Sequence, residues 1–203
     1  MEPAPEKTLY QIAEGQLGYF TAKQAVSAGY LAKNHAYHIK RGHWIREYRS
    51  IYRLANFPHT HEGEMVLWSL WSRNRDEVTE GVYSHETALS IYDVSDAMPA
   101  KLHMTVPLKF RKSTPVPSVI VLHRGELRPE DIQKRNGYAV TTPFRTILDL
   151  VAGQSTPDDI VDQSIMEFRE RGFLIEKEML RLVEEHPSLA KHLLRNRVAG
   201  RNQ

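Results

Sequence analysis

The side chains best suited to chemistry are cations and hydrogen-bonding groups spaced along one short helix. An apolar and aromatic pattern predicts a helix over residues 31–41, with Leu31, His35, His38 and Ile39 on its inner side. The opposite side presents polar and cationic groups: Lys33, Asn34, Tyr37, Lys40 and Arg41. An α-helix fits the major groove of DNA, where such side chains reach base edges and phosphates. The sequence therefore predicts a DNA-reading helix.

Three further arginines lie in a predicted hairpin directly after this helix. Residues 44–48 and 51–54 are rich in aromatic and β-branched side chains, which predicts two strands joined by a two-residue turn. Arg46, Arg49 and Arg53 are then expected to contact phosphates beside the groove. An ordinary amphipathic helix and hairpin with solvated cations is the alternative.

A run of potential metal ligands occurs at His59-Thr60-His61-Glu62. A zinc or iron site needs ligands at fixed spacing on rigid elements, whereas this run lies in a predicted linker and has no HExxH pair elsewhere. Cys is absent, which excludes disulfides, thiolate nucleophiles and cysteine-bound zinc. We therefore predict neither a metal ion nor a cofactor.

Ser84-His85-Glu86 contains the residue types of a catalytic triad. Adjacent residues at a helix start point in different directions, so we expect Ser84 to cap the helix instead. Arg145 and Asp149 are spaced to pair along one helix, and the sequence has no GxxxxGK[ST] loop. We therefore predict no catalytic residue.

The elements before the DNA-reading helix follow the order of a winged helix-turn-helix. A first helix is predicted over residues 6–15, and Thr21 with Gln24 forms a capping-box pattern that opens a second helix ended by Gly29. The DNA-reading helix and the hairpin follow. This order predicts a winged helix-turn-helix DNA-binding domain over residues 1–57.

A second domain is predicted over residues 60–203, after a linker at residues 58–61. Its clearest helix has Thr142 as N-cap and Pro143 at the first helical position. The other expected elements are helices over 62–73 and after Ser84, strands at about 101–107, 118–123 and 138–142, and helices after Thr156-Pro157, over 176–185 and over 188–198. The fold class is therefore α+β, a winged helix-turn-helix followed by a mixed α/β domain ending in helices.

Composition and charge agree with these elements. The 203 residues are 41% apolar and 26% charged, which is typical of a soluble globular protein. The most apolar stretch, residues 65–71, is far shorter than the roughly 20 residues of a membrane-spanning helix, and the N-terminus has no apolar signal core. We expect a cytoplasmic protein. The net charge is +4 over residues 1–55 and −5 over residues 56–105, which favours nucleic acid as the partner of the first quarter.

Several motifs, taken in order, resemble the AbiEi antitoxin family. Those similar to its N-terminal winged helix are residues 20–25 (FTAKQA), 29–30 (GY) and 42–54 (GHWIREYRSIYRL). Those similar to its second domain are residues 83–89 (YSHETAL), 102–107 (LHMTVP) and 140–150 (VTTPFRTILDL). The resemblance covers roughly residues 8–170.

This resemblance implies a prokaryotic transcriptional regulator of a type IV toxin-antitoxin system, the class linked to abortive phage infection. Its winged helix would bind inverted repeats in the double-stranded DNA of its own promoter and repress it. Its second domain would counteract a nucleotidyltransferase-like toxin without a stable complex. The chain departs from the family at the wing, where Ser50 replaces a glycine; a positive φ there would strain the turn.

Three other functions stay open. The first is a protein-interaction adaptor whose winged helix has lost DNA binding, and the second is a transcriptional regulator without a toxin. The third is an enzyme acting on nucleic acid, whose scattered acidic residues the sequence alone does not assemble.

Overall fold

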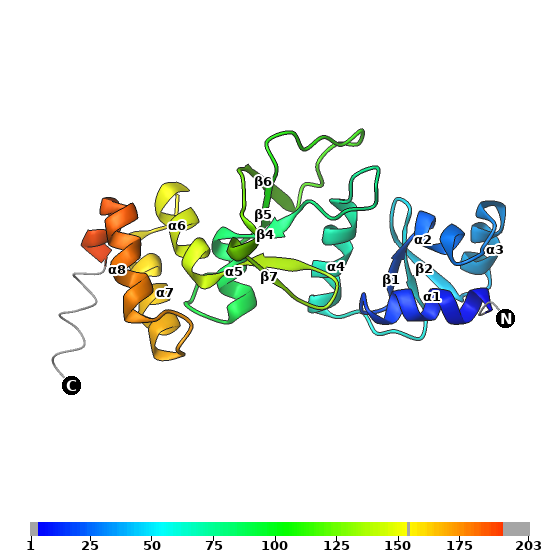
Figure 1. Ribbon diagram of the computed structural model, residues 1–203. Helices are drawn as coiled ribbons and strands as arrows, with labels where there is room; N and C mark the ends of the chain where they lie inside the picture. The colour runs from blue at the N-terminus through cyan, green and yellow to red at the C-terminus, as the bar shows by residue number, and fades with distance from the viewer. Residues whose placement is uncertain (1–3, 154, 193–203) are drawn as a thin grey trace. The chain divides into compact units, whose positions relative to one another are not determined.

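The computed structural model describes residues 4–153 and 155–192 of the chain. The described residues form α-helices and two β-sheets, which confirms the predicted α+β class (Figure 1). No helix in these two ranges is long and apolar enough to cross a membrane.

The chain divides into two compact units. One comprises residues 1–80 with 134–138, and the other residues 81–133 with 139–203. The first unit thus extends past residue 57, the expected end of the winged helix, and includes the helix that follows.

The first unit combines short helices with one small sheet. Its elements are α1 (Pro5–Glu14), β1 (Tyr19–Thr21), α2 (Ala22–Ser27), η1 (Ala32–Asn34), α3 (His35–Lys40), β2 (Trp44–Tyr48), β3 (Ile51–Leu54) and α4 (His61–Trp71). The sheet is antiparallel in the order β1-β3-β2, so the predicted hairpin is confirmed. β1 was not predicted from the sequence, because three residues are too few to show alternation.

Thr21 opens α2 through the predicted capping box. Its hydroxyl accepts a hydrogen bond from the Gln24 amide at 3.2 Å, and the Gln24 side-chain oxygen accepts one from the Thr21 amide at 2.8 Å. These reciprocal bonds satisfy backbone donors that a helix start otherwise leaves unpaired. The entry into α2 is therefore fixed locally.

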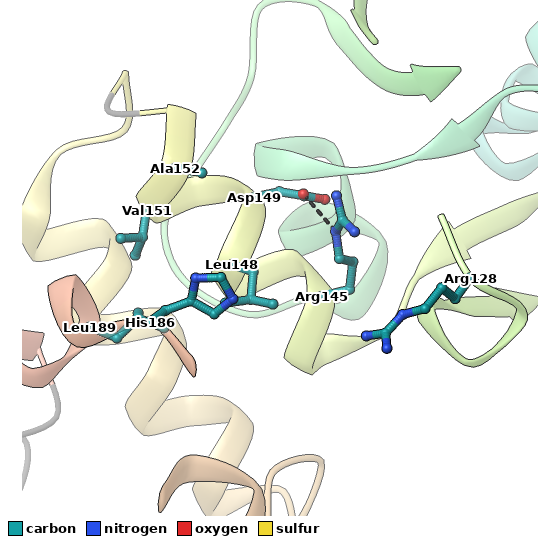
Figure 2. A pocket seen from close by; sticks show the side chains of 8 residues that line it. All are labelled: Arg128, Arg145, Leu148, Asp149, Val151, Ala152, His186 and Leu189. Atoms are coloured by element: carbon teal, nitrogen blue, oxygen red, sulfur yellow. Dashed lines mark hydrogen bonds and ion pairs between the residues drawn. The ribbon is translucent and has the colours of Figure 1, made fainter. Parts of the chain in front are cut away.

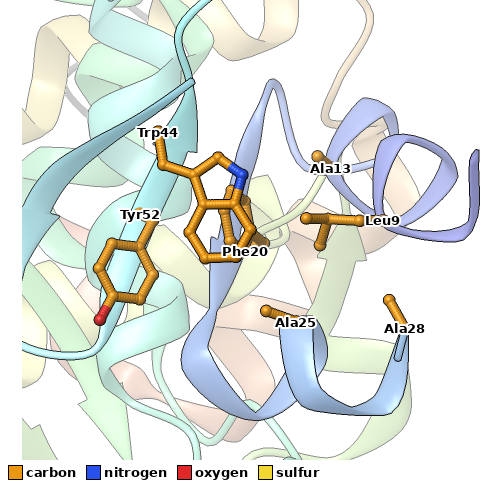
Figure 3. Packing of buried hydrophobic residues seen from close by; sticks show 7 residues of the cluster. All are labelled: Leu9, Ala13, Phe20, Ala25, Ala28, Trp44 and Tyr52. Atoms are coloured by element: carbon orange, nitrogen blue, oxygen red, sulfur yellow. The ribbon is translucent and has the colours of Figure 1, made fainter. Parts of the chain in front are cut away.

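The core of the first unit packs α1 and α2 against the sheet (Figure 3). The Phe20 ring is fully buried and meets the Trp44 ring edge-on, with centroids 4.9 Å apart. Truncating an aromatic side chain in such a core costs about 3–5 kcal/mol. The cluster consists of Leu9, Ala13, Phe20, Ala25, Ala28, Trp44 and Tyr52.

α4 packs closely onto β1 within the same unit. The Thr60 hydroxyl accepts from the Gly63 amide at 3.0 Å and caps the helix, which begins one residue before the predicted start. A Cβ at Gly63 would lie 2.8 Å from Cε2 of Tyr19, so a larger residue would push the helix away from the strand. Every residue from Met65 to Trp71 is buried.

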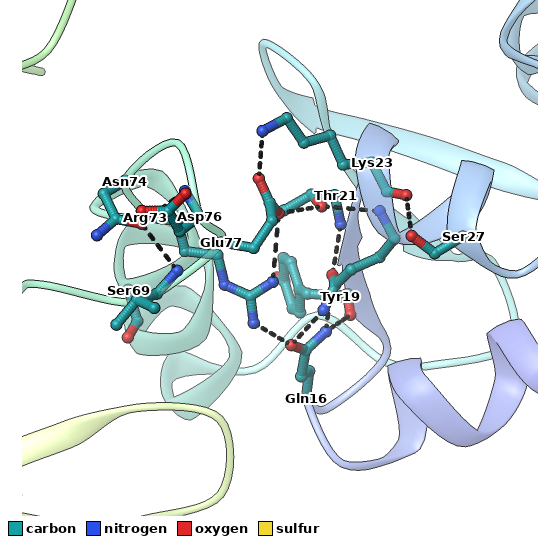
Figure 4. A network of polar contacts seen from close by, with 12 residues as sticks. Gln16, Tyr19, Thr21, Lys23, Ser27, Ser69, Arg73, Asn74, Asp76 and Glu77 are labelled. Atoms are coloured by element: carbon teal, nitrogen blue, oxygen red, sulfur yellow. Dashed lines mark hydrogen bonds and ion pairs between the residues drawn. The ribbon is translucent and has the colours of Figure 1, made fainter.

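A polar network also joins the end of α4 to the start of α2 (Figure 4). The Thr21 hydroxyl donates to Oε2 of Glu77 at 3.2 Å, and Nζ of Lys23 lies 3.0 Å from Oε1 of the same carboxylate. Arg73 lies 3.7 Å from Glu77 and also donates to Gln16. The segment after α4 is therefore tied to the helices at the N-terminus.

The second unit contains a mixed sheet. Its elements are β4 (Val82–Tyr83), α5 (His85–Tyr92), β5 (Leu102–Val106), β6 (Ile120–Arg124), η2 (Pro129–Asp131), β7 (Ile132–Lys134, all but its last residue), β8 (Ala139–Thr141), α6 (Pro143–Gly153), α7 (Asp158–Glu170), α8 (Glu176–Glu185) and η3 (Pro187–Leu189). Two of its helices, α5 and α6, contact the sheet. The strand order is β6-β5-β4-β8-β7, with β5 parallel to β6 and β4 parallel to β8. The short strands β4 and β7 were not predicted.

Three helix predictions in this unit have different outcomes. Thr142 caps α6 through its hydroxyl, which accepts from the Arg145 amide at 3.4 Å, as predicted. Thr156 was expected to cap α7, but Pro157 occupies the N-cap position and the Thr156 hydroxyl donates to Glu86 instead. Most of the helix predicted over 188–198 lies outside the described residues, because the described part ends at residue 192.

Candidate nucleic-acid interface

The helix that the sequence assigns to DNA reading is shorter than predicted and is preceded by a 3₁₀ turn. η1 and the two-turn helix α3 replace the single helix expected over residues 31–41. His35 is buried as expected, with its ring 5.2 Å from that of Trp44. Leu31, expected on the inner side, is 58% exposed because it precedes the first helical turn.

The outer side of this segment carries the predicted DNA-contacting residues. Tyr37 is 53% exposed, and the Arg41 guanidinium lies 5.4 Å from the centroid of its ring. This cation–π contact orders Arg41 while its charge stays accessible. The exposed members of the predicted set on η1 and α3 and at the end of α3 are Lys33, Asn34, Tyr37, Lys40 and Arg41.

The hairpin presents two of its three arginines. Arg46 on β2 and Arg49 in the turn are exposed. Arg53 is 7% exposed: its Nε donates to Oε1 of Glu47 at 2.7 Å and its Nη1 donates to the Phe57 carbonyl oxygen. Arg53 is therefore removed from the predicted DNA-contacting residues, because its guanidinium is buried and hydrogen-bonded within the first unit.

The turn of the hairpin has a strained backbone conformation. Ser50 has a φ of +61°, in the left-handed region that glycine favours. Its carbonyl oxygen accepts from the Ala22 amide at 2.9 Å, so the turn is also held against the start of α2. The hairpin therefore keeps its turn at a local cost in backbone strain.

The histidines of α3 add no positive charge to this surface at neutral pH. Burial lowers the pKa of His35, and the nearby His38 lowers it further. Burial also lowers the pKa of His38, whose ring stacks on Trp44 at 4.7 Å. The cationic character of the surface comes from its lysines and arginines.

The second unit contains a pocket of about 250 Å³ on α6. Figure 2 shows the Arg145 guanidinium and the Asp149 carboxylate facing each other, with Nε and Oδ1 2.8 Å apart. This confirms the predicted pair along the helix. Burial raises the pKa of Asp149, and the charge of Arg145 opposes the rise. The pair is thus a partly desolvated contact that also reaches Asp131, 3.5 Å from Arg145.

A histidine cluster in the second unit was not predicted. The rings of His85 and His123 stack with centroids 3.6 Å apart, and Nδ1 of His103 lies 3.0 Å from Nε2 of His123. The same Nδ1 lies 3.2 Å from Oε2 of Glu86. β5 and β6 pair in parallel and place two of these histidines side by side. The sequence gives no local signal for this cluster, because its members lie on three separate elements.

The hydrogen bonds of Ser84 differ from those of the helix cap that the sequence predicts. It occupies the N-cap position of α5, but its hydroxyl caps no backbone amide. Its Oγ lies 2.9 Å from Nδ1 of His85 and accepts from the Thr105 hydroxyl at 2.8 Å. The expectation that neighbouring side chains point apart is wrong here, because His85 has a left-handed φ of +53°. Glu86 contacts His103 rather than His85, so the three residues form no relay.

Burial lowers the pKa of His85 to about 3, and the neighbouring His123 contributes to the shift. Burial also lowers the pKa values of His103 and His123. The cluster is therefore neutral at physiological pH. Across residues 4–153 and 155–192, no group of three or more histidine, aspartate or glutamate side chains is arranged to hold a metal ion.

Comparisons with known proteins find a solved structure with a similar fold. No protein-family model matches the chain, and no curated protein sequence matches it. Among solved structures, the chain is similar to the crystal structure of the RV2827C protein from Mycobacterium tuberculosis, with a TM-score of 0.57 and 10% sequence identity. The similarity covers 91% of this chain and 72% of that one. At this identity, the comparison shows that the two chains share a fold.

Proposed function

We propose that this protein is a DNA-binding transcriptional autorepressor in which residues 1–57 act as a winged helix-turn-helix. The observation that carries the proposal is the separation of side chains on η1, α3 and the hairpin. His35 and Trp44 are buried on one side. Seven predicted DNA-contacting residues are exposed: Lys33, Asn34, Tyr37, Lys40, Arg41, Arg46 and Arg49.

The proposed mechanism assigns different contacts to the helix and the wing. Asn34 and Tyr37 have hydrogen-bonding groups that suit base edges, and α3 is the element that enters the major groove. Lys40 and Arg41, at the end of α3, neutralise phosphates. Arg49 at the tip of the hairpin contacts the backbone beside the groove. The double-stranded DNA of its own promoter, with inverted repeats, is the proposed target.

For the second unit we propose antitoxin activity in the cytoplasm against a nucleotidyltransferase-like toxin. This proposal rests on the resemblance of residues 83–89, 102–107 and 140–150 to the second domain of AbiEi antitoxins. No stable complex with the toxin is expected. Co-expression with a nucleotidyltransferase from a neighbouring reading frame tests it: growth should be restored, and unrelieved toxicity would contradict the proposal.

Fluorescence anisotropy tests the DNA-binding proposal directly. The full-length protein is titrated into labelled promoter DNA and scrambled DNA across a salt series, with a preference of about a hundredfold or more expected for the promoter. Lys40→Ala with Arg41→Ala should weaken binding to both DNAs. The slope of the logarithm of the binding constant against the logarithm of the salt concentration should also fall in magnitude by about two, because each phosphate contact contributes roughly 0.9.

A matched charge change serves as the control. Lys109 and Arg111 are exposed cations of the second unit, and changing both to alanine removes the same net charge. The salt slope of this variant should stay close to that of the unchanged protein. Equal binding to promoter and scrambled DNA, or equal slopes for the two double variants, would contradict the proposed interface and favour the adaptor function.

A further inference from the structure

The first unit also contains a pocket, which the DNA-binding proposal does not use. A pocket of about 480 Å³ opens between α1, the end of α3 and the ends of β2 and β3. Its volume falls within the range of about 300–1,000 Å³ typical of small-molecule sites. Its lining includes Glu6, Tyr10, Tyr30, His38 and Trp44.

Aromatic rings dominate the lining of this pocket. Tyr30 stands nearly perpendicular to His38 at 5.0 Å and at a steep angle to Trp44 at 5.1 Å. His38 stacks on Trp44, which is 3% exposed. Tyr10 is 41% exposed at the rim. The aromatic surfaces that the pocket offers to a ligand are therefore the rings of Tyr10, Tyr30 and His38.

The charge of the lining is negative, although residues 1–55 carry a net charge of +4. Glu6 is an exposed acidic residue of the lining, and no lysine or arginine is among the described residues that line the pocket. Burial lowers the pKa of His38, so its ring is neutral at physiological pH and does not repel a cation. Burial and the charge of Glu6 raise the pKa of Tyr30, which keeps its hydroxyl protonated.

From the aromatic lining and the single carboxylate, we propose that this pocket binds a small organic cation of the alkylammonium class. The electron-rich faces of tyrosine rings attract ammonium groups within about 6 Å of a ring centroid. The alkyl groups of such a ligand bury apolar surface against the same rings, and Glu6 neutralises its charge. A phosphate or carboxylate ligand would find no lysine or arginine in the described lining.

Isothermal titration calorimetry with two probes tests the proposal on the full-length protein without DNA. Choline carries the quaternary ammonium, and 3,3-dimethylbutan-1-ol is its uncharged analogue of nearly the same shape. Choline should bind in the millimolar range or tighter, and about tenfold more tightly than the analogue. Equal affinities would overturn the proposal in favour of a neutral apolar ligand, and no heat with either probe would overturn it outright.

Variants on α1 locate the binding site. Glu6→Gln should weaken choline binding about fivefold or more, whereas Glu14→Gln, which removes an exposed charge from the other end of the same helix, should leave it unchanged. Tyr10→Leu should weaken binding and Tyr10→Phe should restore it; Tyr10 is exposed, so neither change disturbs the core. Binding that is insensitive to Glu6→Gln would overturn the assignment. Because no DNA is present, these results are independent of the DNA-binding proposal.

Discussion

Nη2 of Arg73 donates a hydrogen bond to Oε1 of Gln16 at 2.8 Å, joining the segment after α4 to the turn between α1 and β1 (Figure 4). Arg73 also lies 3.7 Å from Glu77, and its side chain is 16% exposed. Gln16 in turn exchanges hydrogen bonds with Gln24 on α2. The residues after the predicted domain boundary thus hold together the elements before it.

Removing this guanidinium should destabilise the first unit. Arg73→Leu removes the hydrogen bond to Gln16 and the charge that lies 3.7 Å from Glu77, and we expect a loss of about 2–3 kcal/mol in the free energy of unfolding. Urea unfolding followed by tryptophan fluorescence measures the change. Arg75→Leu is the matched control, because Arg75 is exposed, and should change stability by less than about 0.5 kcal/mol. Equal effects of the two variants would show that the network contributes nothing.

Variants of two arginines in the hairpin, Arg53 and Arg49, should have separate effects on stability and on DNA binding. Arg53→Met removes a buried partner of Glu47, so we expect about 2–4 kcal/mol of destabilisation. Arg49→Met changes an exposed side chain, so stability should hold while affinity for all DNA sequences falls. Thermal unfolding and anisotropy on the same samples measure both. If the Arg53→Met protein were normally stable but bound DNA more weakly, Arg53 would have to be a DNA-contacting residue after all.

These two arginines also show what the sequence can and cannot predict. The hairpin was predicted from its β-prone runs, and the helices from their caps and apolar periodicity, because these signals are local. The burial of Arg53 depends on Glu47 lying across the hairpin, where the register shifts between Arg46 and Tyr48. An irregularity of one residue changes which face a strand side chain takes, and the sequence does not reveal it.

The histidine cluster was missed for a related reason. His103 and His123 meet through the parallel pairing of β5 and β6, and His85 joins them from α5. Such contacts depend on the packing of separate elements, whereas periodicity reports only on a single element. Pairings along one element, such as Arg145 with Asp149, were predicted correctly because helical spacing alone determines them.

Replacing Ser50 by glycine in the strained turn of the β2–β3 hairpin should increase stability. Ser50 has a φ of +61°, which costs a residue with a Cβ about 1 kcal/mol or more, while glycine adopts it freely. Ser50→Gly should therefore raise the free energy of unfolding by about 0.5–1 kcal/mol, after the greater flexibility of glycine in the unfolded chain is offset. Differential scanning calorimetry measures the shift. Ser50→Ala keeps the Cβ and should show no gain; a gain of the same size would locate the effect in the hydroxyl instead.

The histidine cluster should make the second unit sensitive to acid. The pKa of His85 is about 3 in the folded protein and about 6.5 in an unfolded chain, so the unfolded state binds more protons between these values. The stability contributed by neutral His85 is fully present above about pH 6.5 and is lost as the pH falls toward about 3. His103 and His123, whose pKa values are also lowered, act in the same direction.

Urea unfolding at a series of pH values measures this dependence. We expect stability to fall by at least about 1.4 kcal/mol per pH unit below about pH 6, which corresponds to one proton taken up on unfolding. His85→Phe keeps a ring beside His123 but cannot titrate, so its slope should be smaller by about one proton. His59→Gln, a change at an exposed histidine of the first unit, should leave the slope unaltered. An identical slope in the His85→Phe protein would mean that His85 is not buried in its neutral form, and the acid sensitivity would then have to come from other groups.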